Sequence, residues 1–275
     1  MSRAISCLRA SPPHIAASDS TTKRIWWKCA ALVPVAITGI LAGGMDFFRI
    51  LMTSSAGAAA MEWLCGRSSG KKTTTTTGDA FLTGLTLAFL LPPGCPTAAI
   101  LTGDFVAIVI LQECFGGLGG RLFQPAVFAR IFLDMIFPDR LEAPVLFGHA
   151  NEPLVLGGIL AGAAIFLSRR LIYFETPLWY LAISWMSALA LGEMKDPERG
   201  FGITVFAAFF LITDTVTLPL TRKGANVFAI LAAFLTAGLG LHYPAVAATG
   251  YAILITNLTV PWMNARLHPR PGEGS

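Results

Sequence analysis

Apolar segments follow one another along almost the whole chain, and this feature limits the folds that it can adopt. Only 13% of the residues are charged, against about 25% in soluble domains, and the mean hydropathy is +0.64. The ten apolar segments span residues 26–43, 45–65, 79–92, 96–114, 123–137, 153–168, 171–192, 200–213, 225–241 and 244–263. The sequence therefore predicts an all-α integral membrane protein with about ten transmembrane helices.

The positions of lysine and arginine predict the orientation of these helices. With the N-terminus inside, fifteen basic residues fall in inside segments and four in outside loops, in agreement with the positive-inside rule. We therefore expect both termini to be cytoplasmic. The predicted organisation is an N-terminal arm over residues 1–24, a single transmembrane domain over 25–264 and a tail over 265–275.

Three of the predicted helices, the third, fifth and eighth, are short or broken. The third ends at Pro92-Pro93, the fifth follows a glycine-rich break, and the eighth ends before Asp214. In transporters, such helices are the usual pointer to a binding site. The third and eighth segments also share the similar strings GLTLAFLL and GITVFAAFFL, which leaves open two five-helix halves in inverted topology.

The glycine-rich break lies within Phe115–Leu133, FGGLGGRLFQPAVFARIFL. A helix is disfavoured here because each glycine costs roughly 1 kcal/mol relative to alanine. Irregular backbone at membrane depth is tolerated only where protein or a water-filled cavity satisfies its polar groups. We therefore expect Gly116, Gly117 and the nearby Gln124 to line the working part of the protein.

Charged residues inside apolar segments are the candidates for an ion path, because such charges are costly in a membrane and face protein, water or a partner. Asp104 lies some eight residues into the fourth segment without a local partner; it is either an ion- or proton-handling carboxylate or a hydrogen-bonded structural one. Arg130 and Asp134 have the i,i+4 spacing of a helical ion pair. This pair is either part of the ion path or purely structural.

A second polar cluster surrounds Pro219 in the stretch FFLITDTVTLPLTRKG. Thr213, Asp214 and Thr217 belong to it. Hydroxyl and carboxylate groups at a helix end either cap that end or line a polar pocket, and both alternatives stay open here.

Other kinds of site have no support in the sequence. The five cysteines and four histidines are scattered, without the spacing of a metal site. There is no Walker A loop, GxGxxG motif or nucleophile–base pair. We therefore predict no metal site and no catalytic residue. The net charge of +4 is no sign of a nucleic-acid partner in such a chain, and none is expected.

Several motifs resemble the RnfD/NqrB family, which comprises the RnfD component of Rnf-type electron transport complexes and the NqrB component of the sodium-translocating NADH:quinone reductase. GDAFLTGLTLAFLLPP is similar to the family's DGSALLTGLLLALTLPP, and FGGLGGRLFQPAVFARIFL to FGGLGxNxFNPAMxGRxFL. FFLITDTVTLPLTRKG is similar to FFMATDPVTSPLTxKG, and SPPHI to the amino-terminal SPHI. The matches are collinear and cover nearly the whole chain, which is identified as a short, divergent member.

The resemblance implies a flavin-carrying membrane protein with ten helices. Family members attach FMN covalently to a threonine in a D-G-x-S-G-A-T loop after the fifth helix. The corresponding loop here, Pro138–Pro153, contains no serine or threonine, so covalent FMN is predicted to be absent. The alternative is a non-covalent flavin, FMN or riboflavin, bound at Gly116, Gly117, Gln124, Thr213, Asp214 and Thr217.

The resemblance further implies a membrane subunit that helps couple electron transfer to Na⁺ or H⁺ translocation. Its expected partners are the other subunits of a Rnf/Nqr-like complex, the lipid bilayer and the coupling ion, and its expected location is the bacterial cytoplasmic (inner) membrane. The expected role is non-catalytic or electron-relaying. The alternative is a stand-alone channel or transporter for an ion or small solute, without a redox role.

Overall fold

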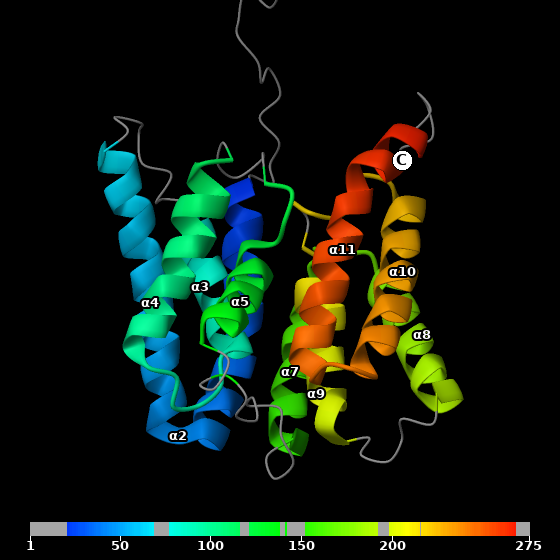
Figure 1. Ribbon diagram of the computed structural model, residues 1–275, viewed down its shortest axis with the longest axis horizontal. Coiled ribbons are helices and arrows are strands. Elements are labelled where there is room, and N and C mark those ends of the chain that lie inside the picture. The colour runs from blue at the N-terminus through cyan, green and yellow to red at the C-terminus, as the bar shows by residue number, and fades with distance from the viewer. Residues whose placement is uncertain are drawn as a thin grey trace, which may run out of the picture.

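The computed structural model describes residues 21–68, 77–115, 121–137, 141, 152–191, 198–214 and 216–267, and every regular element among them is helical. Figure 1 shows the helices side by side in a bundle, most of them running from one end to the other. In chain order the elements are α2 (Thr21–Ser68), α3 (Asp79–Leu90), α4 (Thr97–Phe105), η3 (Val106–Glu113), α5 (Pro125–Ile136), α7 (Glu152–Ser168), α8 (Glu175–Leu191), α9 (Glu198–Phe206), η4 (Ala207–Leu211), α10 (Arg222–Gly240) and α11 (Ala245–Arg266). The prediction of an all-α membrane protein is confirmed.

The first two predicted segments form the two arms of α2. The arms meet at Gly44, whose backbone has φ 62° and ψ −152°, a conformation in which a side chain would be strained. Figure 1 shows the dark blue first arm and the lighter blue second arm joined at the bottom of the view, with both ends of α2 at the top. Gly44 therefore converts one long apolar stretch into a hairpin.

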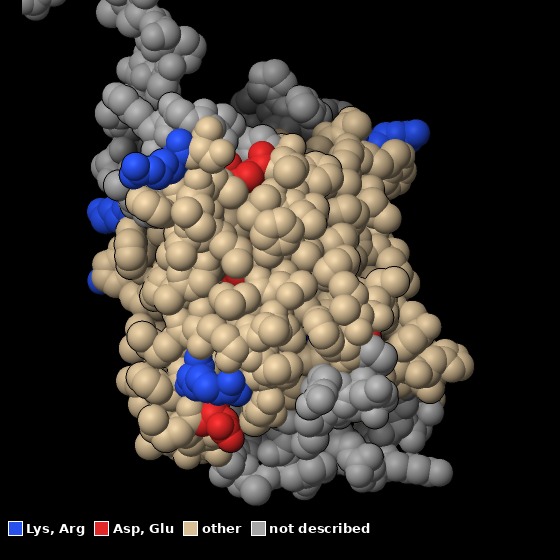
Figure 2. Space-filling model, turned by 60° about the vertical axis from the view of Figure 1, so that its left-hand side comes forward, with Lys and Arg blue, Asp and Glu red and all other residues tan. Residues whose placement is uncertain are grey.

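Length and surface chemistry both fit a membrane. α2, α10 and α11 are by themselves long and apolar enough to cross a bilayer, and several shorter helices are also apolar. Figure 2 shows charged side chains near the upper and lower ends of one face, with a broad, almost uncharged band between them. A band with so few charges can face the hydrocarbon core of a bilayer.

The two central helical stretches are shorter than a membrane is thick. α3 has 12 residues, or about 18 Å, against a hydrocarbon core of about 30 Å. Ten of its twelve residues are buried. The other central stretch, α9 continued by η4, ends at Leu211. The prediction that the third and eighth helices are short is therefore confirmed.

A row of phenylalanine rings joins these two stretches. Phe89 of α3 lies 5.5 Å from Phe206 of α9, measured between ring centroids. Phe206 stacks on Phe210 of η4 at 5.1 Å, and Phe210 lies 4.9 Å from Phe166 of α7. The two halves of the chain, which occupy the left and right of Figure 1, therefore share one apolar core. Their inverted relation stays a prediction.

Glycines allow α7 to pack tightly on the first arm of α2. A Cβ atom at Gly162 would overlap the carbonyl oxygen of Ala31, and one at Gly158 would overlap the Thr38 hydroxyl. A Cβ atom at Gly157, on the same helix, would meet nothing within 4 Å. Close contact between backbones is a common way for helices to pack in lipid, where there is little hydrophobic drive.

We expect Gly162→Ala to lower the free energy of unfolding by about 1–3 kcal/mol, because a backbone oxygen cannot move away as a side chain can. Gly157→Ala is the matched control and should be neutral or stabilising, by up to about 1 kcal/mol. Thermal unfolding in detergent measures both. Equal melting temperatures for the two variants would contradict the close packing of α7 on α2.

Candidate functional site

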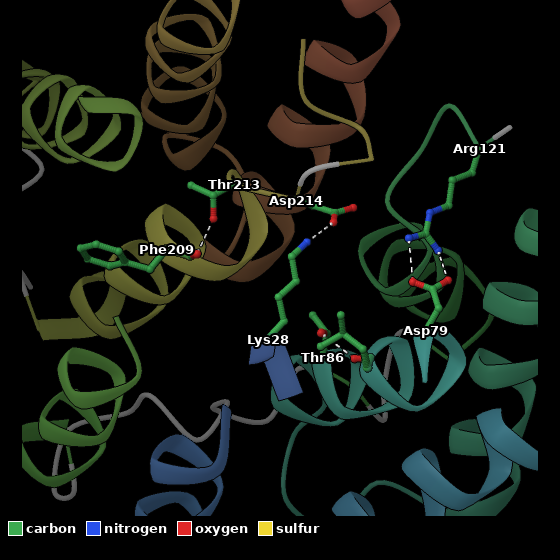
Figure 3. Close-up of polar contacts among 8 residues, drawn as sticks. Lys28, Asp79, Thr86, Arg121, Phe209, Thr213 and Asp214 are labelled. Carbon is green, nitrogen blue, oxygen red and sulfur yellow. Dashed lines mark hydrogen bonds and ion pairs between the residues drawn. The ribbon is translucent and has the colours of Figure 1, made fainter. Parts of the chain in front are cut away.

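Two buried ion pairs lie at one end of the two central stretches. Asp79, in the first turn of α3, is paired with Arg121, which precedes α5; the two guanidinium–carboxylate distances are 2.7 and 3.0 Å. Lys28, on the first arm of α2, donates a hydrogen bond of 3.1 Å to Asp214, which follows η4. Figure 3 shows the two pairs on neighbouring elements. We call these four residues the charged cluster.

The charged cluster is almost completely buried. The side chains of Arg121 and Asp79 are 4% and 3% exposed, and those of Lys28 and Asp214 are 9% and 11% exposed. Buried charges are stable only when they are paired, and here two cations face two carboxylates. The cluster is therefore neutral as a whole, although each charge is costly alone.

A small cavity lies between the two ion pairs. Its volume is about 40 Å³, which is room for about three water molecules. Its polar lining comes from the charged cluster together with Gln124 and three threonines, Thr83, Thr86 and Thr213. Arg121 Nε and Gln124 Oε1 are buried and have no hydrogen-bond partner among the described residues. An internal water can accept a hydrogen bond from Arg121 Nε and donate one to Gln124 Oε1, and of the two only the Gln124 oxygen can bind a cation.

Three of the residues predicted for a flavin site meet at this cavity: Gln124, Thr213 and Asp214. Thr217 is buried but does not line it. Gly116 and Gly117 lie outside the described residues. The Thr213 hydroxyl donates to the carbonyl of Phe209 one turn earlier in the same stretch, and the neighbouring Thr221 accepts a 3.1 Å hydrogen bond from the Gly224 amide as the cap of α10. The polar stretch thus both caps helices and lines a pocket.

The three residues predicted for an ion path lie apart from the charged cluster. Asp104 is fully buried and receives a 2.8 Å hydrogen bond from Ser54 of the second arm of α2. A Cβ atom at Gly57 would come within 2.7 Å of Asp104 Oδ2, so the glycine makes room for the carboxylate. Asp104 is therefore a hydrogen-bonded carboxylate between α2 and α4, and it does not line the cavity.

Arg130 and Asp134 form the i,i+4 ion pair that their spacing predicts. Arg130 also donates from Nε to the carbonyl of Leu90 at 2.8 Å, and from Nη2 to that of Leu141 at 3.4 Å. Leu90 is the last residue of α3, where helix carbonyls lack intrahelical partners. This pair therefore holds the end of α3 that is opposite the charged cluster.

Sequence reasoning missed Lys28, Asp79 and Arg121 as members of the site. Lys28 and Arg121 entered only as basic residues that indicate orientation. Asp79 lies within the motif GDAFLTG, and Arg121 lies between the glycines and the FQPA motif. The available signal was that each of these charged residues lies at the boundary of an apolar segment. Which charge pairs with which depends on helices that are distant in sequence.

The fit to a flavin can be tested against the volume of the cavity. Pockets that bind organic ligands such as a flavin occupy about 300–1,000 Å³. The cavity beside Gln124, Thr213 and Asp214 has a volume of only about 40 Å³. Its charged groups are also already paired with one another. These described residues therefore fit water or a small cation and do not fit an isoalloxazine ring. A non-covalent flavin stays a prediction.

The fold and the cluster define an integral membrane protein with a charged, water-sized site between two short central helices. The chain belongs to the NQR2, RnfD, RnfE family, whose model matches residues 8–147 and 146–272.

Three similar proteins have names that concern ion-translocating complexes. The chain is 30% identical to the D subunit of the ion-translocating oxidoreductase complex of Methanosarcina acetivorans, over 96% of each chain. It is 27% identical to the D subunit of the proton-translocating ferredoxin:NAD(+) oxidoreductase complex of Clostridium ljungdahlii, over 94% of each chain. It is also 27% identical to the Na(+)-translocating counterpart of Acetobacterium woodii, over 92% of this chain and 91% of that one.

Removal of one charge from the cluster should destabilise the protein. Asp79→Asn removes the carboxylate that is paired with the buried Arg121 guanidinium, for which we expect a loss of about 3–5 kcal/mol. The control is Glu175→Gln, which breaks the exposed pair with Arg222 and should cost less than about 1 kcal/mol. Thermal unfolding in detergent measures both variants. If Asp79→Asn were as mild as Glu175→Gln, the cluster would not be a buried pair.

Proposed function

We propose that this chain is a membrane subunit of a Rnf/Nqr-like complex that couples electron transfer to the translocation of Na⁺ or H⁺. Family membership supports this assignment, together with similarity over almost the full length to proteins that are named for such complexes. The observation that carries the proposal is the charged cluster around a water-sized cavity. A cavity of this kind suits a small cation and its water.

Within the cluster we assign the exchangeable carboxylate to Asp214. Lys28 holds it through a single hydrogen bond, and an ammonium group on a flexible stem can turn away from its partner. Asp79 is instead held at both carboxylate oxygens by Arg121, an arrangement that fixes geometry. An arriving Na⁺ or proton would replace the Lys28 charge at Asp214, while the Asp79–Arg121 pair stays in place.

The complex and its location form part of the proposal. We expect other Rnf/Nqr-like subunits as partners and a bacterial cytoplasmic membrane as the location, with both termini in the cytoplasm. The positive-inside distribution then puts the charged cluster near the cytoplasmic side, because Asp79 follows the basic loop with Lys71 and Lys72.

The role of Asp214 can be measured in vesicles that contain the assembled complex. We expect Asp214→Asn to reduce ion uptake driven by the complex's electron donor at least about tenfold, because the neutral amide binds a cation far more weakly. Glu175→Gln should leave uptake unchanged. Full uptake with Asp214→Asn, in a complex that assembles normally, would remove Asp214 from the path.

The alternative function, a stand-alone channel, predicts a different result. Vesicles that contain only the purified chain would then take up ions without any electron donor. We expect no such uptake above that of protein-free vesicles. A donor-independent flux that Asp214→Asn abolishes would favour the channel.

We propose that covalent FMN is absent, because Pro138–Pro153 offers no hydroxyl side chain for a phosphoester. A denaturing gel under ultraviolet light should show no flavin fluorescence at the position of the 29.3 kDa chain. A related protein with the D-G-x-S-G-A-T motif serves as the positive control. A fluorescent band from this chain would overturn the proposal.

A further inference from the structure

A second and larger cavity lies beside the connection between α7 and α8. Its volume is about 730 Å³, within the range of about 300–1,000 Å³ that organic ligands occupy. One wall is formed by residues 170–174 and 176 and the other by residues 218–220, with Arg24 and Arg222 also in the lining. We call it the arginine cavity.

The arginine cavity is strongly basic. Its lining contains Arg24, Arg170 and Arg222 and no acidic residue. Glu175, which does not line the cavity, lies 3.4 Å from Arg222; its other oxygen accepts a hydrogen bond from Asn226. The Arg170 guanidinium has no hydrogen bond or ion pair with the described part of the chain. Its backbone has φ 51°, a conformation that few residues other than glycine adopt.

The same cavity has an apolar rim. Tyr173 is 44% exposed, Phe174 57% and Leu220 74%, and the Arg222 guanidinium lies 5.4 Å from the centroid of the Tyr173 ring. Basic groups and exposed apolar side chains thus occur side by side, at an end of the bundle where several helices begin or end. Arginines with aromatic side chains at this level are typical of the boundary between lipid and water.

We propose that the arginine cavity binds an anionic phospholipid. The phosphodiester of the headgroup would lie between Arg170 and Arg222, and the acyl chains would leave along Phe174 and Leu220. Basic pockets between transmembrane helices on the cytoplasmic side bind such headgroups. A free phosphate ion would leave the apolar rim unused. Residues 1–20, which precede α2, are an unsuitable occupant, because they carry two arginines, Arg3 and Arg9, against the single carboxylate of Asp19.

The test uses the purified, delipidated full chain in detergent, with phosphatidylglycerol as the lipid and phosphatidylcholine as the uncharged comparison. Lipid binding is followed by native mass spectrometry and by the melting temperature. We expect phosphatidylglycerol to bind and to raise the melting temperature, and phosphatidylcholine to do neither. Arg170→Gln and Arg222→Gln should each weaken binding about fivefold, in line with about 1 kcal/mol for each arginine near an anionic lipid surface.

Arg67→Gln is the matched control, since Arg67 also lies over an aromatic ring, 5.6 Å from the centroid of Trp63, but outside the arginine cavity. The affinity of the Arg67→Gln variant for phosphatidylglycerol should equal that of the unchanged protein. Equal binding of phosphatidylcholine, or equal weakening by Arg67→Gln, would overturn the proposal. So would an equal rise in melting temperature with inorganic phosphate or FMN, which would indicate a soluble phosphate ligand. None of these outcomes depends on ion uptake.

Discussion

Two helices can end inside this bundle because the charges at their ends are neutralised in pairs. The Asp79–Arg121 and Lys28–Asp214 pairs lie where α3 begins and η4 has ended. In lipid, an unpaired charge or an unsatisfied helix end costs several kcal/mol. The two pairs satisfy these charges at the ends of the central stretches, and the small cavity lies between the pairs.

The packing around the central helices follows from the same constraint. Lipid chains are as apolar as leucine, so tight contact has to replace the hydrophobic effect between helices. Gly158 and Gly162 bring α7 against the first arm of α2, and Gly84 brings α3 against the second arm at Ser54. The row of rings from Phe89 to Phe166 then fills the space between the two halves.

The architecture could be predicted from the sequence better than the site. The length of an apolar segment indicates a helix, and the basic residues at its ends indicate its orientation, without any knowledge of the helices around it. The sequence therefore predicted the segments on either side of Gly44 and the short third and eighth helices. The i,i+4 spacing likewise predicted the pair formed by Arg130 and Asp134. The charged cluster joins residues up to 186 positions apart, as Lys28 and Asp214 are. No local pattern encodes such a contact.

Asp104 illustrates a different limit. Its place within an apolar segment correctly predicted burial, but the sequence could not supply its partner. Ser54 donates to Asp104, and Gly57 provides the space. Both belong to the second arm of α2, and their position depends on the turn at Gly44. A single backbone conformation thus determines the surroundings of a carboxylate on another helix.

The two arginines that hold α3 have a mechanical consequence. Arg121 binds the helix at Asp79, and Arg130 binds it at the carbonyl of Leu90 while also contacting that of Leu141. Arg121 immediately precedes the turn into α5 and Arg130 lies within it, so both ends of α3 are attached to one neighbouring segment. The short central helix and α5 are thereby joined into a single unit, although neither is long enough to span the membrane by itself.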